Sequence, residues 1–335
     1  MNTERIITFD YLKGIAIFLV VWCHCIQYIT GNSFNNTFYS IIYSFHMPLF
    51  IIISGYLFSR KMDKTIMTLI TKQFSRLIIP NIVWGGVAIS VLSLTTYTIP
   101  SLRDIIKLPT FCWFLSSLFV SSIIYVIIYK IGIRNYVAAT ILLSLSSLLI
   151  PGCEFVKFFI PFFGIGLILA RTNMMRYVLK WKYIIIAGGL IVILYSLLWS
   201  REFYVYCTQN PIYIEFSLPK WSAYFARIIF GSMISIWLML FVRKIEKKVK
   251  YGNVLFNLSR NSLGIYVIHY SLFYVGGAYL NLYVKLAEMS VVALMCVVSV
   301  VIILFINLMI HYLRINKITR ILFLGEKNNR YTFVK

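Results

Sequence analysis

The sequence predicts an all-α, polytopic integral membrane protein with about ten transmembrane helices. Hydrophobic residues make up 60% of its 335 residues, and the mean hydropathy is +0.84. Charged residues make up only 13%. Soluble domains are far less apolar and far more highly charged than this. In lipid, only helices and closed barrels satisfy all backbone hydrogen bonds, and the long apolar runs of this chain favour helices.

A helix needs about 20 mostly apolar residues to cross a bilayer. The chain contains ten such stretches, at 9–29, 40–58, 77–98, 112–130, 135–152, 155–170, 182–199, 222–242, 262–283 and 289–312. The first lacks a small-residue cleavage site and is followed by many others, so we interpret it as a retained span. We expect one membrane domain at 1–313 and a short basic cytoplasmic tail at 314–335.

The charge distribution predicts the orientation of these spans. The chain has 32 Lys and Arg residues against 10 Asp and Glu residues, a formal net charge of +22. If the N-terminus is cytoplasmic, most of the basic residues fall in cytoplasmic segments, as the positive-inside rule requires. We therefore expect a multi-pass protein of the cell membrane with both termini in the cytoplasm. The basic excess reflects topology, and no nucleic-acid partner is expected.

The six cysteines indicate neither a metal site nor a disulfide framework, because no CxxC spacing occurs. Cys23 and Cys25 flank His24, but neighbouring residues on a helix point about 100° apart and cannot close on one ion. We expect no metal.

The first span carries polar residues at helical spacing. Lys13 and His24 are eleven residues apart, which is three turns and a rise of about 16 Å. Asp10 shares their face, and we expect it to pair with Lys13. Polar residues inside a membrane often mark function, although Lys13 could snorkel and His24 could be a satisfied interior imidazole.

The second and third spans add to this pattern. His46 lies near the outer end of the second span, so we expect it to face His24 at a similar depth. Arg60 and Arg76 lie at the inner ends of the second and third spans. Imidazoles outside and cations inside suit a phosphate-bearing donor from the cytoplasm and an acceptor from the other face.

Five sequence blocks in this order resemble acyltransferase family 3, the integral-membrane acyltransferases that modify surface glycans and lipids. The blocks are FDYLKGIAIFLVVWCHC at 9–25, SFHMPLFIIISGYLF at 44–58, RLIIPNIVW at 76–84, WFLSSLF at 113–119 and SLGIYVIHY at 262–270. The resemblance covers most of the chain and is least specific at about 130–225.

This resemblance implies acyl-CoA, most often acetyl-CoA, as donor substrate and a hydroxyl of a glycan or lipid-linked sugar as acceptor. It implies His24 as the catalytic residue, either as general base or as transient acyl carrier. His46 is a second catalytic candidate, with a hydrogen-bonded helix start before Pro48 as the alternative. The same resemblance implies that the CoA phosphates bind to Lys13, Arg60 and Arg76.

Three further residues are supporting candidates. Trp113 could form an aromatic shelf for a sugar or part of an ordinary interfacial belt. Tyr266 and His269 share a helix face, and His269 could point into the cavity or away from it. The tyrosine-rich loop 200–221 suits either a sugar-binding surface or a membrane-proximal flap.

The main rival function is a transporter or flippase of a lipid-linked sugar. It would explain ten spans and buried polar residues, but not a histidine three turns from a cation together with an inner basic cluster. Transporters often show paired broken helices, and no such symmetry is evident. A polysaccharide polymerase normally needs a large outer loop, which the sequence lacks. The expected partners are therefore acyl-CoA, a glycan or lipid-linked sugar and membrane lipids, and the sequence does not indicate an oligomeric state.

Overall fold

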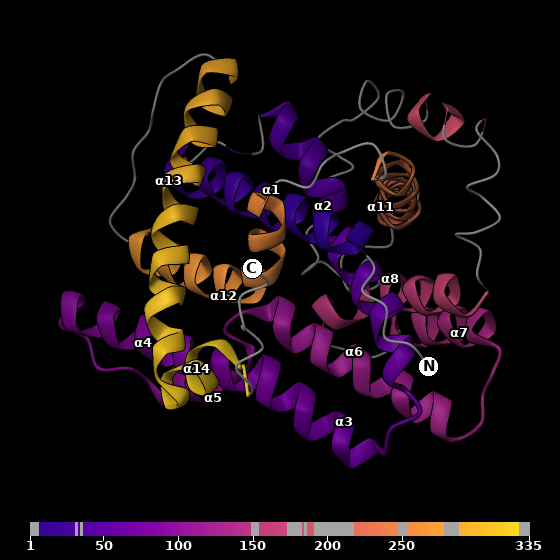
Figure 1. Ribbon diagram of the computed structural model, residues 1–335, viewed down its shortest axis with the longest axis horizontal. Helices are drawn as coiled ribbons and strands as arrows, with labels where there is room; N and C mark the ends of the chain where they lie inside the picture. The colour runs from indigo at the N-terminus through magenta and orange to yellow at the C-terminus, as the bar shows by residue number, and fades with distance from the viewer. Residues whose placement is uncertain are drawn as a thin grey trace.

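The structure is a computed structural model that describes residues 7–30, 33, 36–148, 154–172, 183, 186–190, 218–246, 253–277 and 288–327. Within these residues the chain is helical and contains no strand, which confirms the all-α class (Figure 1). The helices are α1 (Ile7–Thr30), α2 (Thr37–Phe58), α3 (Ile66–Gln73), α4 (Ile79–Thr96), α5 (Leu102–Ile106), α6 (Trp113–Lys130), α7 (Tyr136–Leu148), α8 (Glu154–Arg171), α11 (Leu218–Ile245), α12 (Asn253–Gly276), α13 (Glu288–Ile315) and α14 (Lys317–Leu324).

Six of the described helices are long and apolar enough to cross a membrane. These segments are Ile7–Thr30, Thr37–Lys61, Ile66–Thr96, Trp113–Lys130, Tyr224–Ile245 and Met289–Ile315. They coincide with six of the ten expected spans, so the protein is a membrane protein. The count of ten is not confirmed.

The other expected spans differ in length, composition or coverage. Residues Tyr136–Ser147 form a shorter apolar helix. Helices α8 and α12 lie where two further spans were expected. Helix α8 is apolar but carries three charged residues, Glu154, Lys157 and Arg171, and α12 carries several polar residues that lower its hydropathy. The expected span at 182–199 lies largely outside the described residues.

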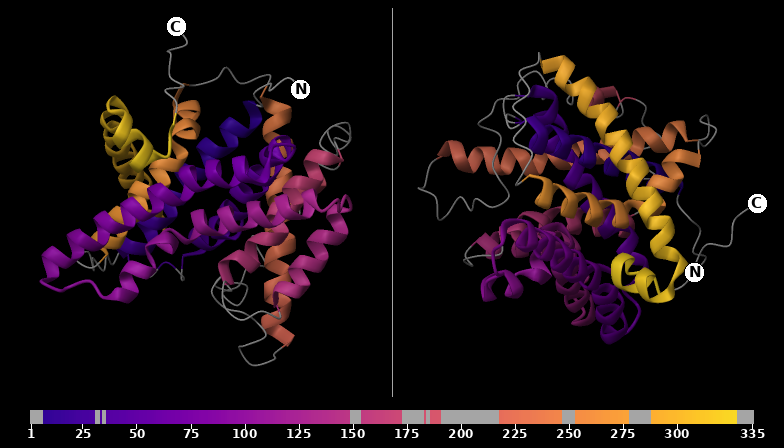
Figure 2. Two further views of the ribbon diagram at one scale, coloured as in Figure 1. Left: turned by 90° about the horizontal axis from the view of Figure 1, so that it is seen from below. Right: turned by 90° about the vertical axis from the view of Figure 1, so that its left-hand side faces the viewer.

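Helix α1 is central to the packing. It contacts α12 and α13 on one side and α2 and α11 on the other. Gly14 allows the closest approach, because a side chain there would collide with the backbone carbonyl of Leu255 in α12. Figure 2 (right) looks onto the side where α13 lies outermost, crossing α1 and α12. The contact between α1 and α12 brings together two segments that are far apart in the sequence.

A π-helical turn, η3 (Phe74–Ile78), joins α3 to α4. Pro80 follows it at the start of α4. Proline has no backbone N–H, and its ring crowds the carbonyl four residues earlier, which here belongs to Arg76. Widening the helix relieves this conflict, and π-turns of this kind occur often at functional sites. The turn places Arg76 within the distorted segment.

Helix α14 packs against α4 and α13. The indole N–H of Trp84 donates to the carbonyl of Phe323 (3.0 Å), and Arg314 forms an ion pair with Glu326 (2.8 Å). Part of the segment expected as a basic tail is therefore a folded helix packed on the membrane helices.

Candidate active site

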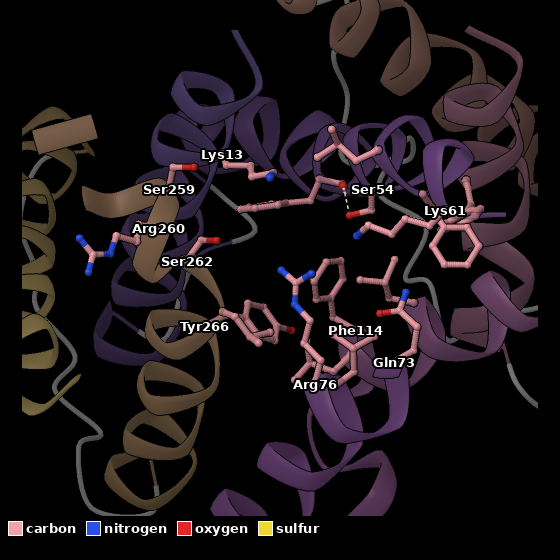
Figure 3. Close-up of a pocket in the computed structure, with 18 residues that line it drawn as sticks. Lys13, Ser54, Lys61, Gln73, Arg76, Phe114, Ser259, Arg260, Ser262 and Tyr266 are labelled. Atoms are coloured by element: carbon pink, nitrogen blue, oxygen red, sulfur yellow. Dashed lines mark hydrogen bonds between the residues drawn. The ribbon is translucent and has the colours of Figure 1, made fainter. Parts of the chain in front are cut away.

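A cavity of about 170 Å³ lies between α1, α2, η3, α6 and α12. Lys13 enters it from α1, Lys61 from the 3-10 turn that follows α2, and Arg76 from η3. Figure 3 shows these three side chains pointing toward the cavity centre, whereas Arg260 points away. The remaining walls are hydroxyl-bearing, amide and apolar side chains, which include Ser54, Gln73, Phe114, Ser259, Ser262 and Tyr266.

The three cations give the cavity a strongly positive character. Such a site suits an anion, and phosphate oxygens form short charge-assisted hydrogen bonds with guanidinium and ammonium groups. The structure brings Lys13 and Arg76 together, as we expected. Arg60 is exposed and does not line the cavity, and the neighbouring Lys61 lies there instead.

Asp10 in α1 forms a hydrogen bond with α12. We expected it to pair with Lys13, one turn away. Its carboxylate accepts a hydrogen bond from the hydroxyl of Ser259 (3.1 Å), which lines the cavity. Asp10 therefore connects α1 to α12 at the level of the cations.

Further along the same two helices, His24 and His269 form a hydrogen-bonded pair. His24 Nδ1 lies 2.8 Å from His269 Nε2, and His269 Nδ1 lies 2.7 Å from the carbonyl of Ile265. A carbonyl can only accept, so His269 Nδ1 carries a proton and donates it to Ile265. In the neutral ring His269 Nε2 is then an acceptor, and His24 Nδ1 must donate to it.

This chain of hydrogen bonds determines which atom of His24 is chemically available. With its proton on Nδ1, neutral His24 has an unprotonated Nε2 with a free lone pair. No hydrogen bond to that atom exists within the part of the chain that the structure describes. His24 is partly exposed, whereas His269 is fully buried. The geometry therefore presents the Nε2 atom of His24 as a base or nucleophile and buries the residue that orients it.

Aromatic rings surround the pair. The ring centroids of Tyr28, Tyr270 and Phe273 lie 5.8, 6.3 and 6.3 Å from that of His24. Tyr266 meets His269 edge to face at 5.5 Å and also lines the cation cavity. Tyr266 thus lies between the histidine pair and the cavity.

His46 is buried within α2. Its Nδ1 donates to the carbonyl of Ile42 in its own helix (2.8 Å), and Tyr43 packs against its ring at 5.3 Å. The hydrogen-bond partner of His24 is His269 and not His46, because α12 packs on α1 at this level. The alternative of a hydrogen-bonded histidine before Pro48 matches this arrangement.

Trp113 packs between helices. Its ring stacks on Phe155 at 4.3 Å and contacts Phe159 at 5.4 Å, which joins α6 to α8. This packing accounts for its position without a sugar ligand. Most of the loop 200–221, the other candidate sugar surface, lies outside the described residues.

Two buried cations were missed by the sequence interpretation. Arg227 in α11 is 3% exposed, and its guanidinium lies 4.8 Å from the ring of Phe158 and 5.4 Å from that of Tyr43. Lys157 in α8 is 4% exposed. Both lie inside expected apolar spans, and a cation in that position is the signal that could have identified them.

Within the described part of the chain, no group of three or more His, Cys, Asp or Glu side chains is arranged to hold a metal ion.

Comparison with known proteins agrees with the sequence resemblance. Residues 6–308 match the acyltransferase 3 family, described as an acyltransferase domain. The chain is 24% identical over 295 residues to the nodulation protein NolL of Mesorhizobium japonicum, covering 81% of this chain and 78% of that protein. It is 26% identical over 226 residues to NolL of Sinorhizobium fredii, covering 61% of this chain and 60% of that protein. No solved structure matches the chain.

Proposed function

Because the chain belongs to the acyltransferase 3 family, we propose that it transfers an acyl group, most simply acetyl, from cytoplasmic acyl-CoA to a hydroxyl of a cell-surface glycan or its lipid-linked precursor. The observation that carries this proposal is the His24–His269 pair, which leaves His24 Nε2 unprotonated on the same two helices, α1 and α12, that line the cation cavity further along.

The donor site is the cavity formed by Lys13, Lys61 and Arg76. Coenzyme A carries several phosphate oxygens at one end and a narrow acyl-pantetheine arm at the other. A cavity of about 170 Å³ is smaller than the roughly 300–1,000 Å³ typical of drug-sized ligands, so it suits the arm better than the whole coenzyme. In this proposal the phosphates contact Lys13, Lys61 and Arg76, and the arm that carries the thioester extends from there along α1 toward His24.

The acceptor reacts at His24. As a general base, His24 Nε2 takes the proton of the acceptor hydroxyl while that oxygen attacks the thioester carbonyl. The carbon–sulfur bond breaks, and the departing thiolate receives the proton from His24. As an acyl carrier, Nε2 instead attacks the thioester carbonyl first, and the carbon–sulfur bond breaks to release the CoA thiolate. The acceptor hydroxyl then takes the acyl group from Nε2, and its proton goes to the thiolate. Both routes use the same atom.

His269 acts through His24 and is a positioning residue. Its acceptor nitrogen holds the proton of His24 on Nδ1 and orients the ring, while the carbonyl of Ile265 orients His269 in turn. Asp10 and Ser259 have an analogous supporting role at the donor end, where they hold α1 and α12 together.

An assay with radiolabelled acetyl-CoA tests this function in isolated membranes. Wild-type protein should label a glycan or lipid-linked sugar. His24→Ala should insert normally and lose about 10²- to 10⁴-fold of the rate, the usual contribution of acid–base catalysis. Transfer near the normal rate by a well-expressed variant would exclude the catalytic role of His24. Uptake or flipping without transfer would instead support the rival transporter function.

Glycan NMR spectra identify the acceptor. Spectra from strains with and without the protein should differ by a single O-acetyl resonance, and its position would identify the acceptor hydroxyl.

A further inference from the structure

A second cavity, of about 610 Å³, lies at the junction of α6, α7 and α8. It is distinct from the cation cavity of the candidate active site and shares no lining residue with it. Its lining residues are Tyr129, Arg134, Asn135, Tyr136, Val137, Ile168, Arg171 and Thr172.

Two arginines converge on one aromatic ring at this cavity. The guanidinium carbons of Arg134 and Arg171 lie 4.3 and 5.3 Å from the ring centroid of Tyr129. Arg134 donates to the carbonyl of Tyr129 (3.2 Å) and Arg171 to that of Ser59 (3.4 Å). Each guanidinium has five N–H donors, so these bonds leave donors for a ligand. Two cations that line the same cavity favour binding of an anion there.

The nearby carboxylate is already engaged elsewhere. Asp63 accepts a hydrogen bond from the hydroxyl of Tyr129, and Lys130 donates to the Asp63 backbone carbonyl (3.3 Å). Among the described residues, Asp63 forms no ion pair with Arg134 or Arg171. The cavity therefore retains its positive charge.

A buried hydroxyl at the same cavity independently indicates a ligand. Tyr136 is only 8% exposed, and its hydroxyl has no hydrogen-bond partner among the described residues. Leaving a buried hydroxyl unpaired is costly, and an acceptor oxygen in the cavity would remove that cost. Tyr136 is also the first residue of α7, so the positive end of the helix dipole lies at the cavity.

An apolar stripe leads away from this anion site. Val137 lines the cavity, and Ile141 and Leu145 follow it at intervals of four residues on the same helix face. These side chains are 50%, 54% and 52% exposed. A soluble anion would make no use of such a surface, whereas an acyl chain would lie along it.

We propose that this cavity binds the phosphate of an anionic phospholipid, with its acyl chain along the exposed face of α7. Arg134 and Arg171 contact the phosphodiester, the hydroxyl of Tyr136 donates to it, and Val137, Ile141 and Leu145 contact the chain. A zwitterionic lipid would bring a choline cation next to the two arginines, so the site selects for net negative charge. Basic pockets between membrane helices on the cytoplasmic side commonly bind such headgroups.

The test is a titration of the purified full-length protein in detergent with phosphatidylglycerol or phosphatidylcholine, read by native mass spectrometry. Wild-type protein should bind phosphatidylglycerol at least about ten-fold more tightly. The double variant Arg134→Ala/Arg171→Ala should lose about ten- to a hundred-fold in phosphatidylglycerol affinity. Arg103→Ala, which removes an exposed cation in α5, is the matched control and should bind normally.

Two conservative variants keep the test valid if the double alanine variant folds poorly. Arg134→Lys/Arg171→Lys keeps both charges and should retain part of the preference for phosphatidylglycerol. Tyr136→Phe removes only the hydroxyl, so its stability should not fall, while affinity should drop by about two- to ten-fold. Equal binding of the two lipids, or an equal loss in Arg103→Ala, would overturn the proposal. Displacement of the lipid by inorganic phosphate or by CoA would likewise overturn it, by assigning the cavity to a soluble anion.

Discussion

His269 Nε2 lies 2.8 Å from His24 Nδ1, although 245 residues separate the two in the sequence. The contact depends on the packing of α12 against α1 and on the carbonyl of Ile265, which accepts a hydrogen bond from the Nδ1–H of His269. His24 alone could protonate at either nitrogen. With His269 beside it, the reactive nitrogen is Nε2, and the ring orientation is set by a buried neighbour.

We predict that replacing His269 lowers the turnover rate and leaves donor binding intact. His269→Phe removes the acceptor for the Nδ1 proton of His24. The imidazole of His24 is then no longer held in one tautomer or in one orientation. Misplacement of a catalytic group by about 1 Å costs on the order of 10²-fold in rate. The value of kcat should therefore fall by about that factor, while the KM for acetyl-CoA changes little. Initial-rate measurements at varied acetyl-CoA concentration separate the two parameters.

His269→Gln is the control for this prediction. Its side-chain carbonyl can accept the His24 proton from a similar position, so it should retain clearly more activity than His269→Phe. Equal activity of the two variants would mean that His269 has only a packing role.

The sequence predicted the elements of this site better than their contacts. Lys13 and His24 share a helix, so their spacing follows from the helical period alone. The resemblance to the acyltransferase family added the block that contains Tyr266 and His269. Which histidine forms a hydrogen bond with His24 depends instead on the packing of α12 against α1, which the sequence alone does not give.

The choice between Arg60 and Lys61 could not be made from the sequence for a similar reason. Both residues follow α2, where a 3-10 turn over Ser59–Lys61 changes the direction of each side chain. A continued α-helix and a 3-10 turn place neighbouring residues on different faces, and a positive-inside argument counts both equally. The count of about ten spans stays a prediction, because parts of the chain, including most of the expected span at 182–199, lie outside the described residues.

We predict different effects for the two arginines that the sequence assigned to the donor. Arg76 points into the cavity, so Arg76→Ala should weaken acetyl-CoA binding by about ten- to a hundred-fold, the value of a lost charge-assisted contact. Arg76→Lys should recover part of this loss. Arg60 is exposed outside the cavity, so Arg60→Ala is the matched control and should bind nearly normally. Calorimetric titration of purified protein with acetyl-CoA measures all three. Equal losses for Arg60→Ala and Arg76→Ala would contradict this assignment.

We predict that the connections before and after the segment Ile66–Thr96 lie on opposite sides of the membrane, since this helix is long enough to cross it. Cysteines introduced at Lys64 and Ile105 test this, because both positions are exposed. In a variant without native cysteines, a membrane-impermeant maleimide should label position 105 in intact cells. Position 64 should react only after the membrane is opened. Labelling of both positions in intact cells would contradict the cytoplasmic assignment of the basic segment around Lys64.

The final prediction concerns the contact between the end of α14 and the donor site. Gly325 terminates α14 with φ of 64°, a backbone conformation that is unfavourable for other residues. A Cβ atom at this position would lie 2.6 Å from the carbonyl oxygen of Arg76 and 2.9 Å from its Cα atom. Gly325→Ala therefore forces α14 away from η3 and shifts the backbone that carries Arg76.

Gly132→Ala separates this collision from backbone strain. Gly132 also has a positive φ, 90°, but a Cβ atom there would meet nothing within 4 Å. Both variants carry the strain of an L-residue in a left-handed conformation, about 1–2 kcal/mol, and both should lower the thermal unfolding temperature. Only Gly325→Ala displaces Arg76, so only this variant should also lose acetyl-CoA affinity. If both variants are less stable but still bind acetyl-CoA as wild type does, α14 does not position Arg76. The packing of α14 on α4 would then contribute to stability only.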